Sequence, residues 1–143
     1  MTIPTEDTTQ SLSPGATALL AYIRANDYVT YAEMPRVLSS FMPVKGDLSA
    51  EVGHVPNLVL WVGMSQEWIQ TLNELFTAGL IWRQPCPVLS YMVDGKVLTL
   101  PVAKRLPKGG YKTPHWGPTC YRPIEKISPA EKQKYAKTKK EQM

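Results

Sequence analysis

The sequence predicts an α+β protein, with helices in its first half and extended chain in its second half. Apolar residues recur at helical spacing in two segments before residue 80. Of the 13 prolines, eight lie from Pro85 onward, where they exclude long helices and central strands. The pair Asp94-Gly95 between two apolar runs is a strong hairpin signal. These three observations favour a helical core followed by a small antiparallel sheet.

Composition describes one ordinary globular domain. The chain has 143 residues, 43% apolar and 20% charged, which is enough to bury a core without disulfides or metal. Its longest apolar run, residues 58–62, is too short to span a bilayer, and its polar, acidic N-terminus does not resemble a signal peptide. Two cysteines are too few for a disulfide framework. We therefore expect a cytoplasmic protein with reduced thiols and no membrane partner.

A first helix is predicted from Pro14 to about Asn26. Ser13 and Pro14 suit the N-cap and the first helical position. Four apolar side chains then fall on one helix face: Ala16, Leu19, Leu20 and Ile23. Residues 1–12 show no periodicity and are rich in Thr, Ser and Gln, so we expect a disordered arm there.

A second helix is predicted after a short β-like stretch at residues 28–30. Thr30 and Glu33 have the spacing of a capping box for a helix that runs to about Met42. Pro35 conflicts with this start because it removes a helical hydrogen bond. The helix therefore begins either near Thr30 or at Pro35.

A long loop and an ambiguous segment precede the third helix. Prolines and glycines in residues 43–56 predict a loop, and residues 57–62 fit either a strand or a helical turn and a half. Ser65 can cap a helix that runs to Ala78, and Gly79 follows where glycine commonly ends helices. The apolar face of this helix consists of Trp68, Leu72, Leu75 and Phe76.

The predicted hairpin joins residues 88–93 to residues 96–102. A two-residue turn would place four side chains on one face, toward the helices: Leu89, Tyr91, Leu98 and Leu100. Extended chain at residues 81–83 precedes the hairpin, and residues 115–122 are expected to add a last strand.

A C-terminal helix is predicted from a capping box at Ser128 and Glu131. Its apolar content is too thin for firm docking, so we expect it to be solvated. The domain organisation that follows is a disordered arm at 1–12, a folded domain at 13–124 and a basic extension at 125–143.

Two groups of residues carry a resemblance to a known fold. Gly63-Met64-Ser65 is similar to the turn before a recognition helix, where glycine reverses the chain and serine caps the next helix. Residues 72–81 resemble the end of that helix and the start of a wing strand. Over residues 13–102 the chain thus resembles the winged helix-turn-helix superfamily, which implies a three-helix core with a small antiparallel wing. Residues 43–62 depart from the pattern because they lengthen the connection between the second and third helices.

The charge of the chain is divided between its halves. Residues 1–80 carry a net charge of −5 and residues 81–143 a net charge of +9, which suggests an anionic partner for the second half. If the strands form a meander, five basic side chains cluster near one wing tip, where they can neutralise phosphates: Arg83, Lys104, Arg105, Lys108 and Lys112. The alternative is a merely solubilising tail, since five lysines lie in the last twelve residues.

Aromatic and glycine residues lie within this basic loop. Gly109-Gly110 permits close backbone approach to a ligand or entry into a minor groove. Tyr111 lies among the charges together with Trp116, and such aromatics suit stacking on unpaired bases. The alternative is that both aromatics belong to the core or to an edge strand.

The third helix offers a polar face for reading bases. Gln66, Gln70 and Asn73 lie on one uncharged stripe with Thr77, and Gln and Asn can pair with adenine edges. Recognition helices of winged-helix proteins enter the major groove. The alternative is an ordinary solvated face, which two acidic residues and the absence of Lys and Arg favour.

Signals for other chemistry are weak. The sequence contains no nucleophile-elbow motif, no P-loop and no Cys or His pair at metal-ligand spacing. We therefore expect no catalysis, no cofactor and no metal. The leading hypothesis is a small transcriptional regulator that binds double-stranded DNA mainly through phosphates. A protein-interaction module and a binder of single-stranded nucleic acid are the alternatives, and the sequence is compatible with a homodimer.

Overall fold

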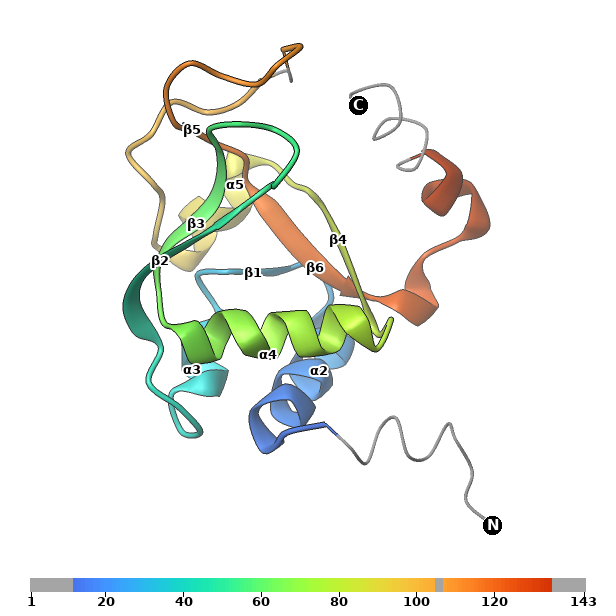
Figure 1. Ribbon diagram of the computed structural model, residues 1–143. Coiled ribbons are helices and arrows are strands. Elements are labelled where there is room, and N and C mark those ends of the chain that lie inside the picture. Colours follow the sequence, from blue (N-terminus) through green and yellow to red (C-terminus); the bar gives the residue numbers. More distant parts are fainter. Residues whose placement is uncertain (1–11, 105–106, 135–143) are drawn as a thin grey trace.

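The computed structural model describes residues 12–104 and 107–134 and confirms an α+β architecture. Two three-stranded sheets lie beside a group of helices (Figure 1). The predictions for residues 1–11, 105–106 and 135–143 fall outside the described residues. Within the described ranges, the helices are all too short or too polar to cross a membrane.

The first two helices begin near the predicted positions. Helix α2 runs over Pro14–Asn26, and the Ser13 hydroxyl accepts a hydrogen bond from the Ala16 N–H at 3.3 Å. The same hydroxyl donates to the Glu74 carboxylate at 2.8 Å, which ties the start of this helix to a distant one. Helix α3 is shorter than predicted, Met34–Leu38, because Pro35 is accepted only in its first turn.

Strand β1, Val29–Thr30, precedes α3. Only one of the two hydrogen bonds of the predicted capping box is found among the described residues. The Thr30 N–H donates to the Glu33 carboxylate at 2.9 Å. The Thr30 hydroxyl donates to the Asp94 carboxylate at 2.6 Å, so this turn is held from two sides.

Residues 43–64 form a hairpin instead of a long loop. Strand β2, Lys45–Glu51, pairs antiparallel with strand β3, Leu58–Met64, through an irregular register. The prediction of a loop at residues 43–56 was therefore wrong for β2, and the ambiguous segment is a strand. Long-range pairing decides this region, and the local pattern does not reveal its partner.

Helix α4, Gln66–Thr77, follows the hairpin directly. The Ser65 hydroxyl accepts from the Trp68 N–H at 3.0 Å and donates to the Pro43 carbonyl at 2.7 Å. Gly79 adopts a positive φ of 71° and ends the helix as predicted. Gly63 and Met64 therefore end strand β3, and Ser65 alone separates this strand from α4.

The predicted hairpin at residues 88–102 was wrong. Residues Val88–Asp94 form helix α5, and Gly95 is its C-cap with φ 84° and ψ 10°. Asp-Gly favours a left-handed glycine, which both a tight hairpin turn and a helix C-cap require. As a result Tyr91 is fully buried, whereas Leu89 is 64% exposed; the two were predicted to share a face.

The remaining strands complete two sheets. Strand β4, Ile81–Pro85, pairs antiparallel with β6, Thr119–Pro123, which also pairs with β1. Strand β5, His115–Trp116, pairs parallel with β3. The prediction of extended chain at 115–122 is confirmed, although this segment forms two strands, β5 and β6, which belong to different sheets.

Aromatic side chains fill the space between the sheets and the helices. The Tyr31 and Tyr121 hydroxyls share a hydrogen bond, and the Tyr91 hydroxyl donates to the Thr119 carbonyl at 2.6 Å. Trp61 stacks on Tyr91 with ring centroids 5.2 Å apart. This aromatic cluster also contains Trp68 and Trp116.

A short 3₁₀ turn, Ile124–Lys126, leads to the C-terminal helical residues 129–134. The Ser128 N–H donates to the Glu131 carboxylate, and the Ser128 hydroxyl accepts from the Glu131 N–H. These two hydrogen bonds confirm the predicted capping box. The described part of this helix is largely exposed, as expected from its composition.

Candidate nucleic-acid interface

The predicted basic loop presents three exposed lysines. Lys104, Lys108 and Lys112 are all exposed, and none forms an ion pair with a carboxylate of the described residues. The sequence from residue 95 to residue 124 contains no Asp or Glu. Arg105, the fourth cation predicted for this loop, lies outside the described residues. The lysines are therefore free to meet an external anion.

The backbone of the loop is held against the β2–β3 hairpin. The Tyr111 N–H donates to the Pro56 carbonyl at 3.0 Å, and the Asn57 amide donates to the Tyr111 carbonyl at 2.8 Å. A side chain at Gly110 would clash with the Pro56 backbone, with a Cβ only 2.6 Å from its carbonyl oxygen. Internal packing thus explains Gly110, whereas Gly109 lies in open space at φ 81°.

Two aromatic rings stack beside the lysines. Tyr111 is half-buried and lies parallel to the His115 imidazole, with centroids 3.9 Å apart. Trp116, the other aromatic considered for base stacking, is only 1% exposed and donates to the Leu60 carbonyl. Trp116 is therefore a core residue, and its proposed stacking role was wrong.

The polar stripe of α4 is exposed but lies far from the basic loop. Gln66, Gln70 and Asn73 all face solvent. Figure 1 shows α4 in the lower part of the molecule and the orange segment that follows residue 106 at the top, with both sheets between them. The two predicted binding groups therefore do not form one continuous surface.

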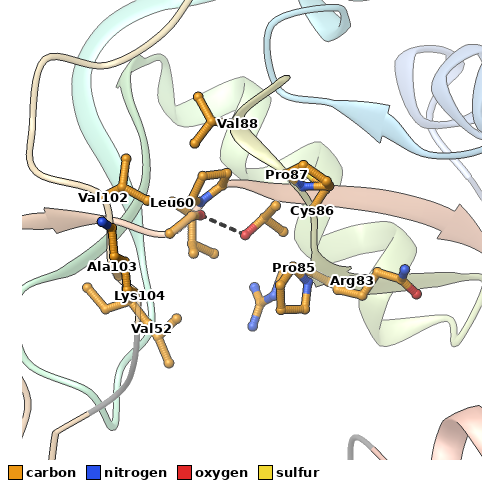
Figure 2. A pocket seen from close by; sticks show the side chains of 15 residues that line it. Val52, Leu60, Arg83, Pro85, Cys86, Pro87, Val88, Val102, Ala103 and Lys104 are labelled. Carbon is orange, nitrogen blue, oxygen red and sulfur yellow. Dashed lines mark hydrogen bonds between the residues drawn. The ribbon is translucent and has the colours of Figure 1, made fainter. Parts of the chain in front are cut away.

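Arg83 joins Lys104 at a different feature, a cavity of about 510 Å³ between strands β3 and β4 (Figure 2). The Arg83 guanidinium also lies 5.2 Å from the centre of the Phe76 ring. Arg83 and Lys104 line the same cavity, but the meander that was expected to cluster the basic residues does not form, because residues 88–94 are helical. Lys108 and Lys112 do not line the cavity.

Both cysteines lie at one wall of this region. Gln84 pairs with Cys120 across β4 and β6, and the Cys86 N–H donates to the Pro118 carbonyl at 3.0 Å. The Cys120 thiol donates to the Cys86 sulfur, and this bond, with a further one from Ser90, lowers the pKa of the Cys86 thiol despite its partial burial. The same hydrogen bond and burial raise the pKa of Cys120. Cys86 is half-buried and Cys120 fully buried, so Cys86 is the more accessible thiol.

Sequence reasoning missed the cavity, and it did not reveal that the rings of Tyr111 and His115 stack on each other. The apolar residues that line the cavity come from five separate segments, and no local spacing links them. Within the described ranges, no group of three or more His, Cys, Asp or Glu side chains is placed to hold a metal ion.

Comparisons with known proteins give one partial similarity. A glutamate–tRNA ligase from Herminiimonas arsenicoxydans is 36% identical over 63 residues, which are 43% of this chain and 14% of that protein. The chain therefore spans a small part of the length of the relative it matches. No protein-family model and no solved structure matches the chain.

Proposed function

We propose that the protein binds double-stranded DNA through the phosphates, using the basic loop, and that it acts as a transcriptional regulator. The observation that carries the proposal is a set of exposed lysines that form no ion pair with a carboxylate in the part of the chain that the structure describes: Lys104, Lys108 and Lys112. Lysines that are not neutralised within the protein release counterions from DNA on binding. The absence of acidic residues from 95 to 124 removes nearby repulsion.

The winged-helix assignment remains part of this proposal. Helices α2, α3 and α4 and the small antiparallel sheet of β1, β6 and β4 support it. The β2–β3 hairpin precedes α4, whereas a wing follows the recognition helix, and helix α5 occupies the segment predicted as the wing. The DNA contacts proposed here depend on the lysines and not on the fold assignment.

The test is fluorescence anisotropy of labelled random duplex DNA across a salt series. Changing Lys104, Lys108 and Lys112 together to Gln is expected to reduce the slope of log K against log salt by about 3. A matched control changes Lys96, Lys126 and Lys132 to Gln, which removes the same charge elsewhere on the surface. Equal loss in both variants would mean a general charge effect, and absence of binding at low salt would refute the proposal.

Single-stranded nucleic acid is the second arm of the same experiment. The stacked Tyr111–His115 pair beside the lysines favours it, because bases stack on exposed aromatic rings. The tRNA in the name of the similar ligase makes RNA the natural probe beside single-stranded DNA. Tighter binding to single strands than to duplex, lost in Tyr111→Ala, would favour this alternative.

An exposed apolar face on helix α5 favours a protein-interaction role. Helix α5 exposes Leu89, Met92 and Val93, at 64%, 61% and 78%, and these positions share one helix face. Exposed apolar groups of this kind mark interaction surfaces. Self-association seen by sedimentation, and abolished by Val93→Gln without loss of folding, would support a homodimer through α5.

A further inference from the structure

The cavity between strands β3 and β4 has the size and lining of a small-molecule site. Its volume of about 510 Å³ lies within the usual range for ligand pockets. Apolar side chains and proline rings form most of its walls: Val52, Leu58, Leu60, Pro85, Pro87, Val88, Val102, Ala103 and Pro118. In Figure 2, Val52, Val102 and Ala103 face Pro85, Cys86 and Pro87 across the open space. An apolar ligand placed there would remove from water both its own surface and the apolar surface of the cavity walls.

Two strand edges border this space. The outer edge of β4 pairs with no other strand of the described residues, whereas the outer edge of β5 is hydrogen-bonded to residues 101–103, of which Val102 and Ala103 line the cavity. The segment from β5 to β6 passes between them, where a Cβ at Gly117 would lie 3.0 Å from the Leu58 side chain. The walls are therefore backbone and packed residues, which makes the cavity largely pre-formed.

The charges around the cavity have one sign. Arg83 and Lys104 line it from opposite walls, and none of its lining residues is acidic. Neither cation forms an ion pair with a carboxylate of the described residues. A guanidinium at the edge of an apolar pocket favours a carboxylate, sulfonate or phosphate, to which it can donate two parallel hydrogen bonds.

We propose that this cavity binds a small amphipathic organic anion, with its apolar body between β3 and β4 and its anionic group at Arg83 and Lys104. The site is separate from the proposed DNA surface, since Lys108 and Lys112 do not line it. Lys104 belongs to both features and would place a bound anion next to the DNA-binding loop.

The test uses two fluorescent probes of nearly the same shape. Anilinonaphthalene sulfonate carries an anionic group, and N-phenylnaphthylamine is its uncharged counterpart. We expect the intact protein to bind the sulfonate more tightly, by about tenfold, which corresponds to one charge-assisted hydrogen bond. Decanoate, a carboxylate with an apolar tail, is expected to displace both probes. Equal affinity for the two probes would refute the anionic preference, and binding of neither would refute the site.

Matched variants locate the binding. Arg83→Gln and Lys104→Gln are each expected to weaken sulfonate binding and leave the neutral probe unchanged, whereas Lys96→Gln, on an exposed residue outside the cavity, affects neither. Arg83→Lys retains the charge and is expected to restore most of the affinity. Ala103→Trp fills the cavity and is expected to abolish binding of both probes. Unchanged binding in Ala103→Trp, with a cooperative unfolding transition, would place the probes elsewhere and overturn the proposal.

Cys86 supplies an independent readout. Cys86 lines the cavity and is half-buried, whereas Cys120 is fully buried, so neutral iodoacetamide should modify Cys86 first. Saturating decanoate is expected to slow this modification in the intact protein and not in Ala103→Trp. Modification that is indifferent to decanoate would contradict the location. Changing only Lys108 and Lys112, which do not line the cavity, is expected to weaken DNA binding and to leave this protection of Cys86 unchanged, so the two proposals can fail separately.

Discussion

Arg122 links three parts of the chain that are distant in the sequence. Its guanidinium donates to the Asp27 carboxylate at 3.0 and 3.2 Å and to Glu131 at 3.1 Å. It also lies 4.3 Å from the centre of the Tyr28 ring. Arg122 and Asp27 side chains are only 9% and 14% exposed. Removing one partner of a pair so sheltered from water leaves the other charge buried without its counter-ion, which costs more than breaking a surface ion pair.

The pKa of Asp27 makes this pair dependent on pH. Burial raises its pKa, but hydrogen bonds from Arg122 and the Tyr28 N–H, with the charges of Arg122 and Lys126, outweigh burial and hold it below 3.8. The ionised form is therefore favoured by folding. Its contribution is fully present above pH 3.8 and is lost as the pH falls through the lower pKa of the folded state.

Asp27→Asn is expected to destabilise the protein by about 2 kcal/mol at neutral pH, since Arg122 loses its charged acceptor. The difference from the unmodified protein should shrink in acid, because protonation removes the same charge from Asp27. Urea unfolding at neutral pH and near pH 3 measures both values. Arg24→Gln is the control, because its ion pair with Glu125 is exposed and contributes little. A difference that does not change with pH would contradict the role of the Asp27 charge.

At the scale of elements, helix α5 shows how a short segment is determined by its surroundings. Seven residues are too few for periodicity to separate helix from strand. The Tyr91 hydroxyl accepts from the Tyr31 N–H at 3.2 Å and donates to the Thr119 carbonyl. Its ring lies edge-on to Trp116, with centroids 5.0 Å apart. These contacts fix one face of α5 and leave its other apolar residues exposed.

Tyr91→Phe and Leu89→Gln test this arrangement as a pair. Removing the Tyr91 hydroxyl leaves two buried backbone groups without their partner and is expected to cost about 2 kcal/mol. Leu89→Gln is expected to change stability by less than about 0.5 kcal/mol, because Leu89 is exposed. Thermal unfolding of both variants provides the comparison. A large cost for Leu89→Gln would favour the hairpin, in which both residues face the core.

At the scale of the whole molecule, the basic loop and the polar stripe of α4 lie at opposite ends (Figure 1). DNA held by Lys108 and Lys112 would have to pass around both sheets to reach Gln70. The Ser13–Glu74 hydrogen bonds further commit α4 to packing against α2. This arrangement separates phosphate binding from any base reading by α4.

Changing Gln66, Gln70 and Asn73 together to Ala is therefore expected to leave duplex affinity within about twofold of the original. Base contacts by these side chains would each contribute about 1–3 kcal/mol, so their loss would weaken binding far more. Anisotropy with the same random duplex measures the effect, with the three-lysine variant as the positive control. Strong weakening in the α4 variant would restore that helix as a DNA-reading element.

Helix caps and helix ends could be predicted from the sequence, because they depend on neighbouring residues. Ser13 and Ser65 cap α2 and α4, Gly79 ends α4, and Ser128 with Glu131 starts the last helix. Each is a contact within a few residues, so its signal lies in the local sequence. The exposure of the lysines in the basic loop was equally predictable, because a charged side chain without a partner stays at the surface.

Features that depend on partners far along the chain become visible only in the folded protein. The pairing of β3 with β5, the helical form of 88–94 and the burial of Trp116 all rest on such contacts. Asp94-Gly95 signals a left-handed glycine in either a hairpin or a helix cap, and burial of Tyr91 selects the helix. The cavity that Arg83 and Lys104 line is built from segments far apart in the chain, which no local pattern records.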